Sequence, residues 1–333
     1  MGALQCRSHA GPRQQRVASP MIIDLTDTDT PSISKRLSRE REATGFSALG
    51  RVLTLVVIAR ADDEARAIAT AVAASQEHPM RVLVLIPQPE ADADRLDAQL
   101  RLGNDTGASE VIVMRALGAV ASALDTIVIG LLLPDAPVVL WLANGDVDAP
   151  LGSLAELAAR RVSDVGRCSD PVGSLLDAAR AYRPGDTDLA WSQISVLRAQ
   201  LAATLDQPPH LTVTAAALTG SPNSPEFLLL SAWLALRLGV PVAMHDSTSS
   251  LPVSEVRLTR PDGDIVLCGD PAAGMSRLTL PGLPEQQLPL TQRTEAECLS
   301  EELRRLDQDR VFGEVLRSGL PLILEAQGDD DDA

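Results

Sequence analysis

The sequence predicts an α/β protein built from two Rossmann-like domains with mixed, mostly parallel sheets. Three observations predict this class. Short β-branched and aliphatic runs, such as 52–58 and 81–86, are typical of buried strands. Segments with apolar residues at helical spacing lie between these runs, and Pro- and Gly-rich turns bound them. This alternation of strands and helices favours parallel strands joined by right-handed crossovers.

The composition supports a large aliphatic core and argues against several classes of function. Of the 333 residues, 45% are hydrophobic but only 2% are aromatic, so the core must consist of leucine, valine, isoleucine and alanine. The formal net charge of −16 argues against nucleic-acid binding, which needs a basic face. Lys35 is the only lysine and no glycine loop surrounds it, so a phosphate-binding lysine is not expected.

The cysteines and the N-terminal segment bear on location. Cysteines at positions 6, 168, 268 and 298 form no Cys-x-x-Cys motif, which favours a reduced, cytoplasmic protein over a zinc or disulfide scaffold. Residues 1–20 carry arginines without an apolar segment. We expect them to be a disordered extension, with Met21 as the true start; a genuine basic arm is the alternative. No segment is typical of a membrane span, because the longest apolar stretch, 227–244, contains Arg237 and Pro241.

Residues 21–183 are predicted to form the first α/β domain. The strands at 52–58 and 81–86 flank a helix that Asp62 can cap, which makes a βαβ unit. Further strands are expected at 96–102, 111–114 and 138–142. Helices are expected at 154–162 and at 170–182, the second one opened by Asp170-Pro171.

Residues 184–320 are predicted to form the second α/β domain, and 321–333 an acidic disordered tail. The turn at 183–188 is the expected boundary, followed by a helix from Trp191 to about 207. Ser224-Pro225 and Gly239 bound a helix over 225–238. The remaining signals are strands at 211–218 and 240–245, a hairpin turn at 261–264 and a capping box of Thr294 and Glu297.

No complete catalytic, cofactor-binding or metal site is predicted. The strand 52–58 is followed by Ala59-Arg60-Ala61-Asp62-Asp63 in place of a Gly-x-Gly-x-x-Gly loop. Two acids at the start of the next helix disfavour a phosphate on electrostatic grounds. His245 beside Asp246, together with the turn 221–225, is the strongest alternative site for an enzyme. The competing interpretation is a structural or solvated histidine, because no complete site surrounds it.

The turn 184–191 is the candidate partner-binding surface. Asp186 and Asp188 precede Trp191, and tryptophan is enriched at interface hot spots. The competing interpretation is internal, with one acid capping the next helix and Trp191 filling the core. We expect a mixture in which Trp191 is mainly structural and both acids face outward.

The same stretch, Pro184 to Trp191, resembles a signature of the OpcA family, the glucose-6-phosphate dehydrogenase assembly proteins. Further stretches similar to this family lie at 95–101 with 107–113, 131–139, and 203–209 with 232–241. Their combination in this order covers nearly all of residues 21–320. The extension at 1–20 and the acidic tail lie outside the resemblance.

The resemblance implies a non-enzymatic factor that binds glucose-6-phosphate dehydrogenase and favours its active oligomer, in the oxidative pentose phosphate pathway. It implies no catalytic residue and no cofactor, and no cysteine pair here matches the relatives linked to redox control. From the residues alone, a second hypothesis stays open. It is a small-molecule-binding α/β enzyme with its site near His245 and the turn 221–225.

Overall fold

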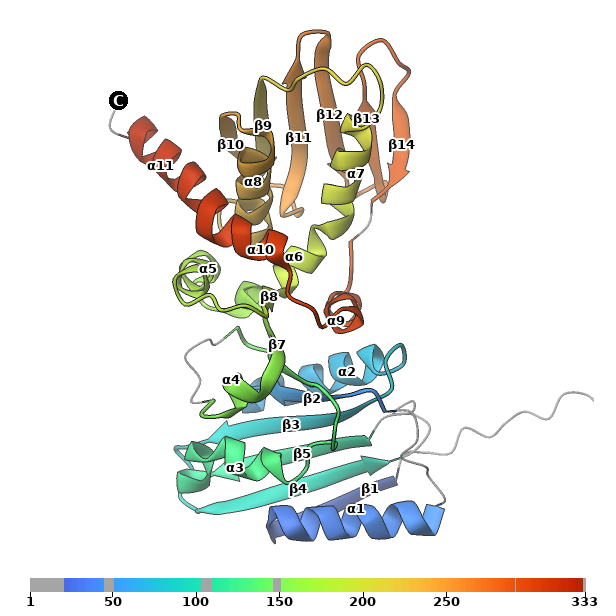
Figure 1. Ribbon diagram of the computed structural model, residues 1–333, viewed down its shortest axis with the longest axis vertical. Helices are drawn as coiled ribbons and strands as arrows, with labels where there is room; N and C mark the ends of the chain where they lie inside the picture. The colour runs from blue at the N-terminus through green and yellow to red at the C-terminus, as the bar shows by residue number, and fades with distance from the viewer. Residues whose placement is uncertain (1–20, 45–50, 103–109, 146–150, 291, 332–333) are drawn as a thin grey trace, which may run out of the picture.

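The computed structural model describes residues 21–44, 51–102, 110–145, 151–290 and 292–331. It contains an eight-stranded sheet and a six-stranded sheet, which lie at opposite ends of an elongated molecule (Figure 1). The α/β class is therefore confirmed. The expected extension at 1–20 lies outside the described residues.

The first sheet has the strand order β1-β4-β5-β3-β2-β6-β7-β8. In the part of this order that runs β5-β3-β2-β6-β7-β8, all neighbouring strands are parallel. The strand β4 pairs antiparallel with both β1 and β5. Taken alone, the six parallel strands have the order 3-2-1-4-5-6 of a Rossmann fold. The strands span β1 (Met21–Thr28), β2 (Leu53–Ile58), β3 (Met80–Gln88), β4 (Arg95–Leu102), β5 (Glu110–Leu117), β6 (Val138–Leu142), β7 (Ala158–Ser163) and β8 (Asp186–Asp188).

Helices cover both faces of this sheet, as a parallel sheet with apolar side chains on both faces requires. One face packs against α1 (Thr30–Thr44) and α3 (Leu124–Ile129) through residues such as Ile33 and Ile127. The other face packs against α2 (Glu64–Ala74) and α9 (Glu295–Arg304). Because α9 comes from the C-terminal third of the chain, its Leu299 and Leu303 close a core that the first half begins.

The second sheet has the order β10-β9-β11-β12-β13-β14, and only its pair β9–β10 is parallel. The expected predominance of parallel pairs is therefore confirmed for the first sheet and wrong for the second. Short turns explain the difference, because a two-residue connection such as Pro261-Asp262 joins only antiparallel strands. The strands span β9 (Ala215–Gly220), β10 (Val242–Asp246), β11 (Val253–Arg260), β12 (Gly263–Asp270), β13 (Met275–Thr279) and β14 (Gln286–Pro289).

The helix α8 (Pro225–Leu238) forms the centre of the second core. Ser224 caps it by accepting a hydrogen bond from the Phe227 backbone N–H, and Gly239 ends it at φ +64°. Phe227 and the three leucines that follow it directly, 228–230, are buried. Around it lie α5 (Pro171–Arg180), α6 (Leu189–Gln193), α7 (Ser195–Leu205), α10 (Arg310–Glu314), a π-helical turn (Val315–Gly319) and α11 (Leu320–Asp331).

Two expected elements are wrong. The helix predicted over 154–162 stops after one turn, α4 (Leu154–Leu157), and the chain continues as β7. Strand pairing explains why these residues are not helical, because β7 lies between β6 and β8 and pairs with both. The tail predicted as disordered from 321 is helical through Asp331, because Leu320 and Ile323 are buried in the second core. Residues 332–333 lie outside the described residues.

The predicted boundary at 183–184 lies just before β8, whose backbone pairs with the first sheet. The two halves thus share a strand and the helix α9, and the division into two domains stays a prediction. Among the described residues, no helix is long and apolar enough to cross a membrane.

Candidate functional site

The turn between α5 and α6 places the candidate residues where the two halves of the molecule meet (Figure 1). Gly185 has φ +98°, and a Cβ at this position would lie 2.9 Å from the Ala159 carbonyl oxygen. Only glycine fits such a close approach at this dihedral angle. The turn therefore brings β8 alongside β7, with Arg161 opposite Asp186 and Ser163 opposite Asp188.

Asp186 is held by two donors but remains accessible. Its Oδ1 accepts a hydrogen bond from Arg161 Nε at 2.5 Å, and its Oδ2 accepts one from the Arg183 backbone N–H at 2.6 Å. The side chain of Asp186 retains 25% of its exposure, and that of Arg161 retains 15%. A partly exposed ion pair of this kind can rearrange towards a charged partner at a modest cost.

Asp188 is buried, and both of its carboxylate oxygens accept hydrogen bonds from groups of the same chain. Its carboxylate accepts hydrogen bonds from Ser163 Oγ at 2.6 Å, from the Val165 N–H at 3.0 Å and from the Ala190 N–H at 2.9 Å. Burial raises the pKa of Asp188 to about 6, although these three donors favour its charged form. The capping role is therefore confirmed for Asp188, the N-cap residue of α6. The expectation that it faces outward is wrong.

Trp191 lies in the core that α6, α7 and α10 share, with 1% of its surface exposed. Its indole Nε1 donates a hydrogen bond to Asp309 Oδ2 at 2.8 Å. The Arg198 guanidinium lies 3.3 Å from the centre of the indole ring, and the Phe312 ring centre lies 5.6 Å away. The structural role expected for Trp191 is confirmed. Its contact with a partner is not tested by a single chain and stays a prediction.

A cleft of about 360 Å³ opens beside this turn. Its charged lining residues are Arg161, Arg183, Glu156, Asp186 and the buried Asp188, and apolar side chains such as Leu175 form much of the rest. The volume lies within the ~300–1,000 Å³ of pockets that hold small ligands. Two arginines and three acids line the cleft, so the walls favour a polar contact surface of mixed charge over a dedicated anion site.

A cavity of about 180 Å³ contains a group of titratable side chains from both halves of the chain. Burial and the nearby Asp188 carboxylate raise the pKa of Asp164 to about 8, and a hydrogen bond to Glu295 favours its protonated form. Burial also raises the pKa of Cys298 to about 12, and its Sγ donates to Gln193 Oε1 at 2.9 Å. A thiol with so high a pKa is a poor nucleophile at neutral pH.

The alternative site near His245 lies in the second sheet. His245 is exposed on β10, which forms one edge of that sheet. The turn 221–225 caps α8, because Ser224 Oγ accepts a hydrogen bond from the Phe227 N–H and donates one to Glu226 Oε2. The structure thus supports the capping interpretation of this turn.

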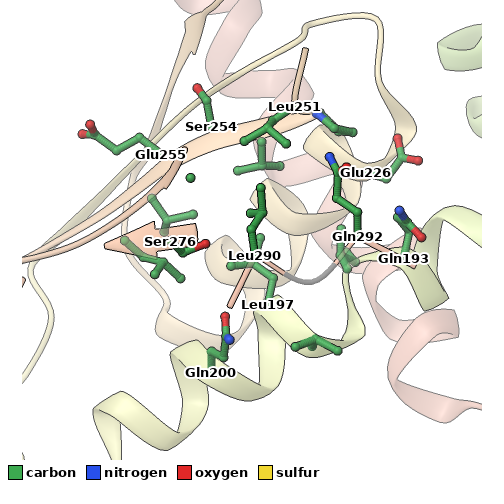
Figure 2. A pocket seen from close by; sticks show the side chains of 17 residues that line it. Gln193, Leu197, Gln200, Glu226, Leu251, Ser254, Glu255, Ser276, Leu290 and Gln292 are labelled. Atoms are coloured by element: carbon green, nitrogen blue, oxygen red, sulfur yellow. The ribbon is translucent and has the colours of Figure 1, made fainter. Parts of the chain in front are cut away.

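A pocket of about 90 Å³ lies between α7 and the second sheet (Figure 2). Figure 2 shows the amide side chains of Gln193, Gln200 and Gln292 around a floor that includes Leu197 and Leu290. The volume is well below the ~300 Å³ at which ligand pockets begin. The sequence carries no local signal for this pocket, because its walls come from several segments spread over residues 193–292.

The described residues contain no group of three or more His, Cys, Asp or Glu side chains that could hold a metal ion. The segment after β2 places Asp62 and Asp63 before α2, where a Rossmann protein binds phosphate. This segment is held by hydrogen bonds within the chain. Asn144 Oδ1 accepts a hydrogen bond from the Arg60 N–H, and Asn144 Nδ2 donates one to Asp63.

Comparison with known families links both halves of the chain to one family. Residues 71–180 match the family model for the N-terminal domain of a glucose-6-phosphate dehydrogenase subunit. Residues 184–316 match the model for the C-terminal domain of the same protein. No individual curated protein matches the chain. The two matches follow each other in order and meet at the turn before β8, so the chain belongs to the OpcA family of glucose-6-phosphate dehydrogenase assembly proteins.

Proposed function

We propose that this protein is a non-enzymatic factor that binds glucose-6-phosphate dehydrogenase and favours its active oligomer. The family match over both halves, 71–180 and 184–316, is the observation that carries the proposal. A factor that binds one oligomeric state more tightly than the others raises its population by mass action. No chemical step by the factor itself is needed.

The proposed contact surface is the rim of the 360 Å³ cleft, with Asp186 as one of its two accessible acids beside Glu156. Asp186 keeps a quarter of its side-chain exposure, whereas Asp188 and Trp191 behind it are buried and hold the turn in place. The chain is acidic overall, which favours a basic patch on the partner. We place the complex in the cytoplasm, because the cysteines at 6, 168, 268 and 298 form no Cys-x-x-Cys motif, which favours a reduced compartment.

Titration of the host's glucose-6-phosphate dehydrogenase with this protein tests the proposal. Enzyme activity is expected to rise and to saturate with concentration, and light scattering is expected to show a larger oligomer. Unchanged activity and an unchanged oligomer at micromolar excess would contradict it. The same assay with this protein alone separates the enzyme alternative, because NADP reduction without added dehydrogenase requires a catalytic site of its own.

A further inference from the structure

A cavity of about 430 Å³ lies at the carboxyl ends of the central parallel strands in the first sheet. Its walls are the ends of β2, β3 and β6 and the turn Gly118–Ser122 that follows β5. The chain leaves β2 towards β3 on one side and later returns to β6 on the other side. Such a topological switch point is where open α/β sheets bind ligands.

The walls of this cavity are preformed and mostly apolar. Pro87, Pro89 and Leu142 are among the side chains that line it. The turn after β5 is fixed, because Asp94 Oδ1 accepts a hydrogen bond from the Ala119 N–H at 2.7 Å. Gly118 has φ +57°, and a Cβ there would collide with the same Asp94 oxygen. A rigid apolar pocket of this size is suited to a small ligand.

One charged residue, Arg60, is among the lining residues. Its guanidinium is 63% exposed and lies 3.9 Å from Asp62 and 3.8 Å from Asp63, too far for strong hydrogen bonds. A planar guanidinium on the wall of an apolar pocket can stack on a flat ring. The lining therefore favours a planar ligand.

The charges beside the cavity disfavour a phosphate on that ligand. Asp62 and Asp63 lie in the first turn before α2, where a nucleotide phosphate would need backbone N–H groups and positive charge. Asp62 is 80% exposed, and its carboxylate lies 3.9 Å from the Arg60 guanidinium. Asp63 is already shared between Arg66 and Asn144. The two carboxylates thus offset the nearby Arg60 and Arg66, so no net positive charge is available for a phosphate at this position.

We propose that this cavity binds a neutral, planar ligand of nucleoside size and discriminates against its phosphorylated form. The apolar walls enclose the ring, Arg60 stacks on it, and Asp62 repels a 5′-phosphate. This site and the cleft beside Asp186 have Leu142 in common, and their other lining residues differ. The proposal does not depend on the partner of the protein.

Calorimetric titration of the full chain with adenosine and with AMP tests the site. Adenosine is expected to bind saturably, and AMP about threefold more weakly, the effect of one like charge at a helix N-terminus. Asp62→Asn is expected to remove this difference by strengthening AMP binding. Ala119→Phe, on an exposed residue of the cavity wall, is expected to weaken adenosine binding at least about tenfold, or about 1.4 kcal/mol.

The control is Ala272→Phe, at another exposed alanine in the second half, which is expected to leave adenosine binding unchanged. Ser122 is also exposed and also lies in the cavity wall. Ser122→Trp is therefore a second variant that fills the cavity, for use if Ala119→Phe does not fold. Absence of saturable adenosine binding at about 1 mM would overturn the site. Binding unaffected by both blocking variants would overturn it too, and AMP binding as tight as adenosine would overturn the discrimination.

Discussion

Arg160 of β7 and Glu302 of α9 form a buried ion pair across the junction between the two halves of the chain. Arg160 Nε donates to Glu302 Oε2 at 3.0 Å, and both side chains are only 5% exposed. The other Glu302 oxygen accepts from Ser192 Oγ, and Arg160 Nη1 donates to the Asp307 carbonyl at 2.7 Å. One carboxylate thus connects the first sheet, α6 and α9.

Glu302→Ala is expected to lower the free energy of unfolding by about 3 kcal/mol, because it leaves the Arg160 charge buried without its partner. Urea unfolding followed by circular dichroism measures this change. Asp177→Ala is the matched control, since Asp177 pairs with Arg180 at the surface and is 62% exposed. It is expected to cost less than about 1 kcal/mol. Equal costs for the two variants would mean that the buried pair does not join the halves.

Asp188→Ala is expected to cost about 1–2 kcal/mol of stability, because it removes the cap of α6 and leaves buried donors unpaired. Binding to glucose-6-phosphate dehydrogenase by the folded fraction is expected to stay intact. The measurements are urea unfolding and a binding titration below the unfolding transition. Weakened binding at unchanged stability would assign Asp188 to the interface instead.

Asp186→Ala is expected to weaken partner binding and to change the stability of the protein little. Its ion pair with Arg161 is partly exposed, so the stability loss should stay below about 1 kcal/mol. Loss of an accessible charge at the rim is expected to weaken partner binding about fivefold, or about 1 kcal/mol. Surface plasmon resonance with immobilised dehydrogenase measures it, and Asp177→Ala serves as a control acid outside the cleft. Identical affinities for both variants would place the interface elsewhere.

Stability is expected to depend on pH through Asp164. Its pKa is raised from 3.8 to about 8 by burial and by Asp188, with Glu295 and Arg167 also nearby. A carboxyl with a raised folded-state pKa binds its proton more tightly in the folded state. Its contribution is therefore present at low pH and is lost as pH rises from about 4 to about 8.

Asp164→Asn removes this dependence while keeping a donor for Glu295. Relative to the wild type, the variant is expected to gain at least about 1 kcal/mol between pH 5 and pH 8. Urea unfolding at the two pH values measures the difference, with Asp177→Asn as the exposed control. A difference that does not grow with pH would mean that Asp164 is charged throughout.

Local signals in the sequence predicted the elements that local chemistry controls. Ser224-Pro225 and Gly239 define α8, Thr294 and Glu297 form their capping box, and Pro261-Asp262 makes the β11–β12 turn. Each of these signals acts within a few residues, so neighbouring side chains and backbone dihedral angles suffice to set it. The order of the motifs also led to the family that the comparisons show.

Tertiary structure decided what depends on partners far away in the chain. Residues 158–163 carry a helical pattern but form β7, because open strand edges at β6 and β8 pair with them. Asp188 is turned inward, because donors from Ser163 and Val165 meet it only after β7 and β8 align. The sequence by itself determined the class, the caps and the turns. Only long-range pairing and burial decided which acids are buried, because those energies depend on the three-dimensional neighbours of a side chain.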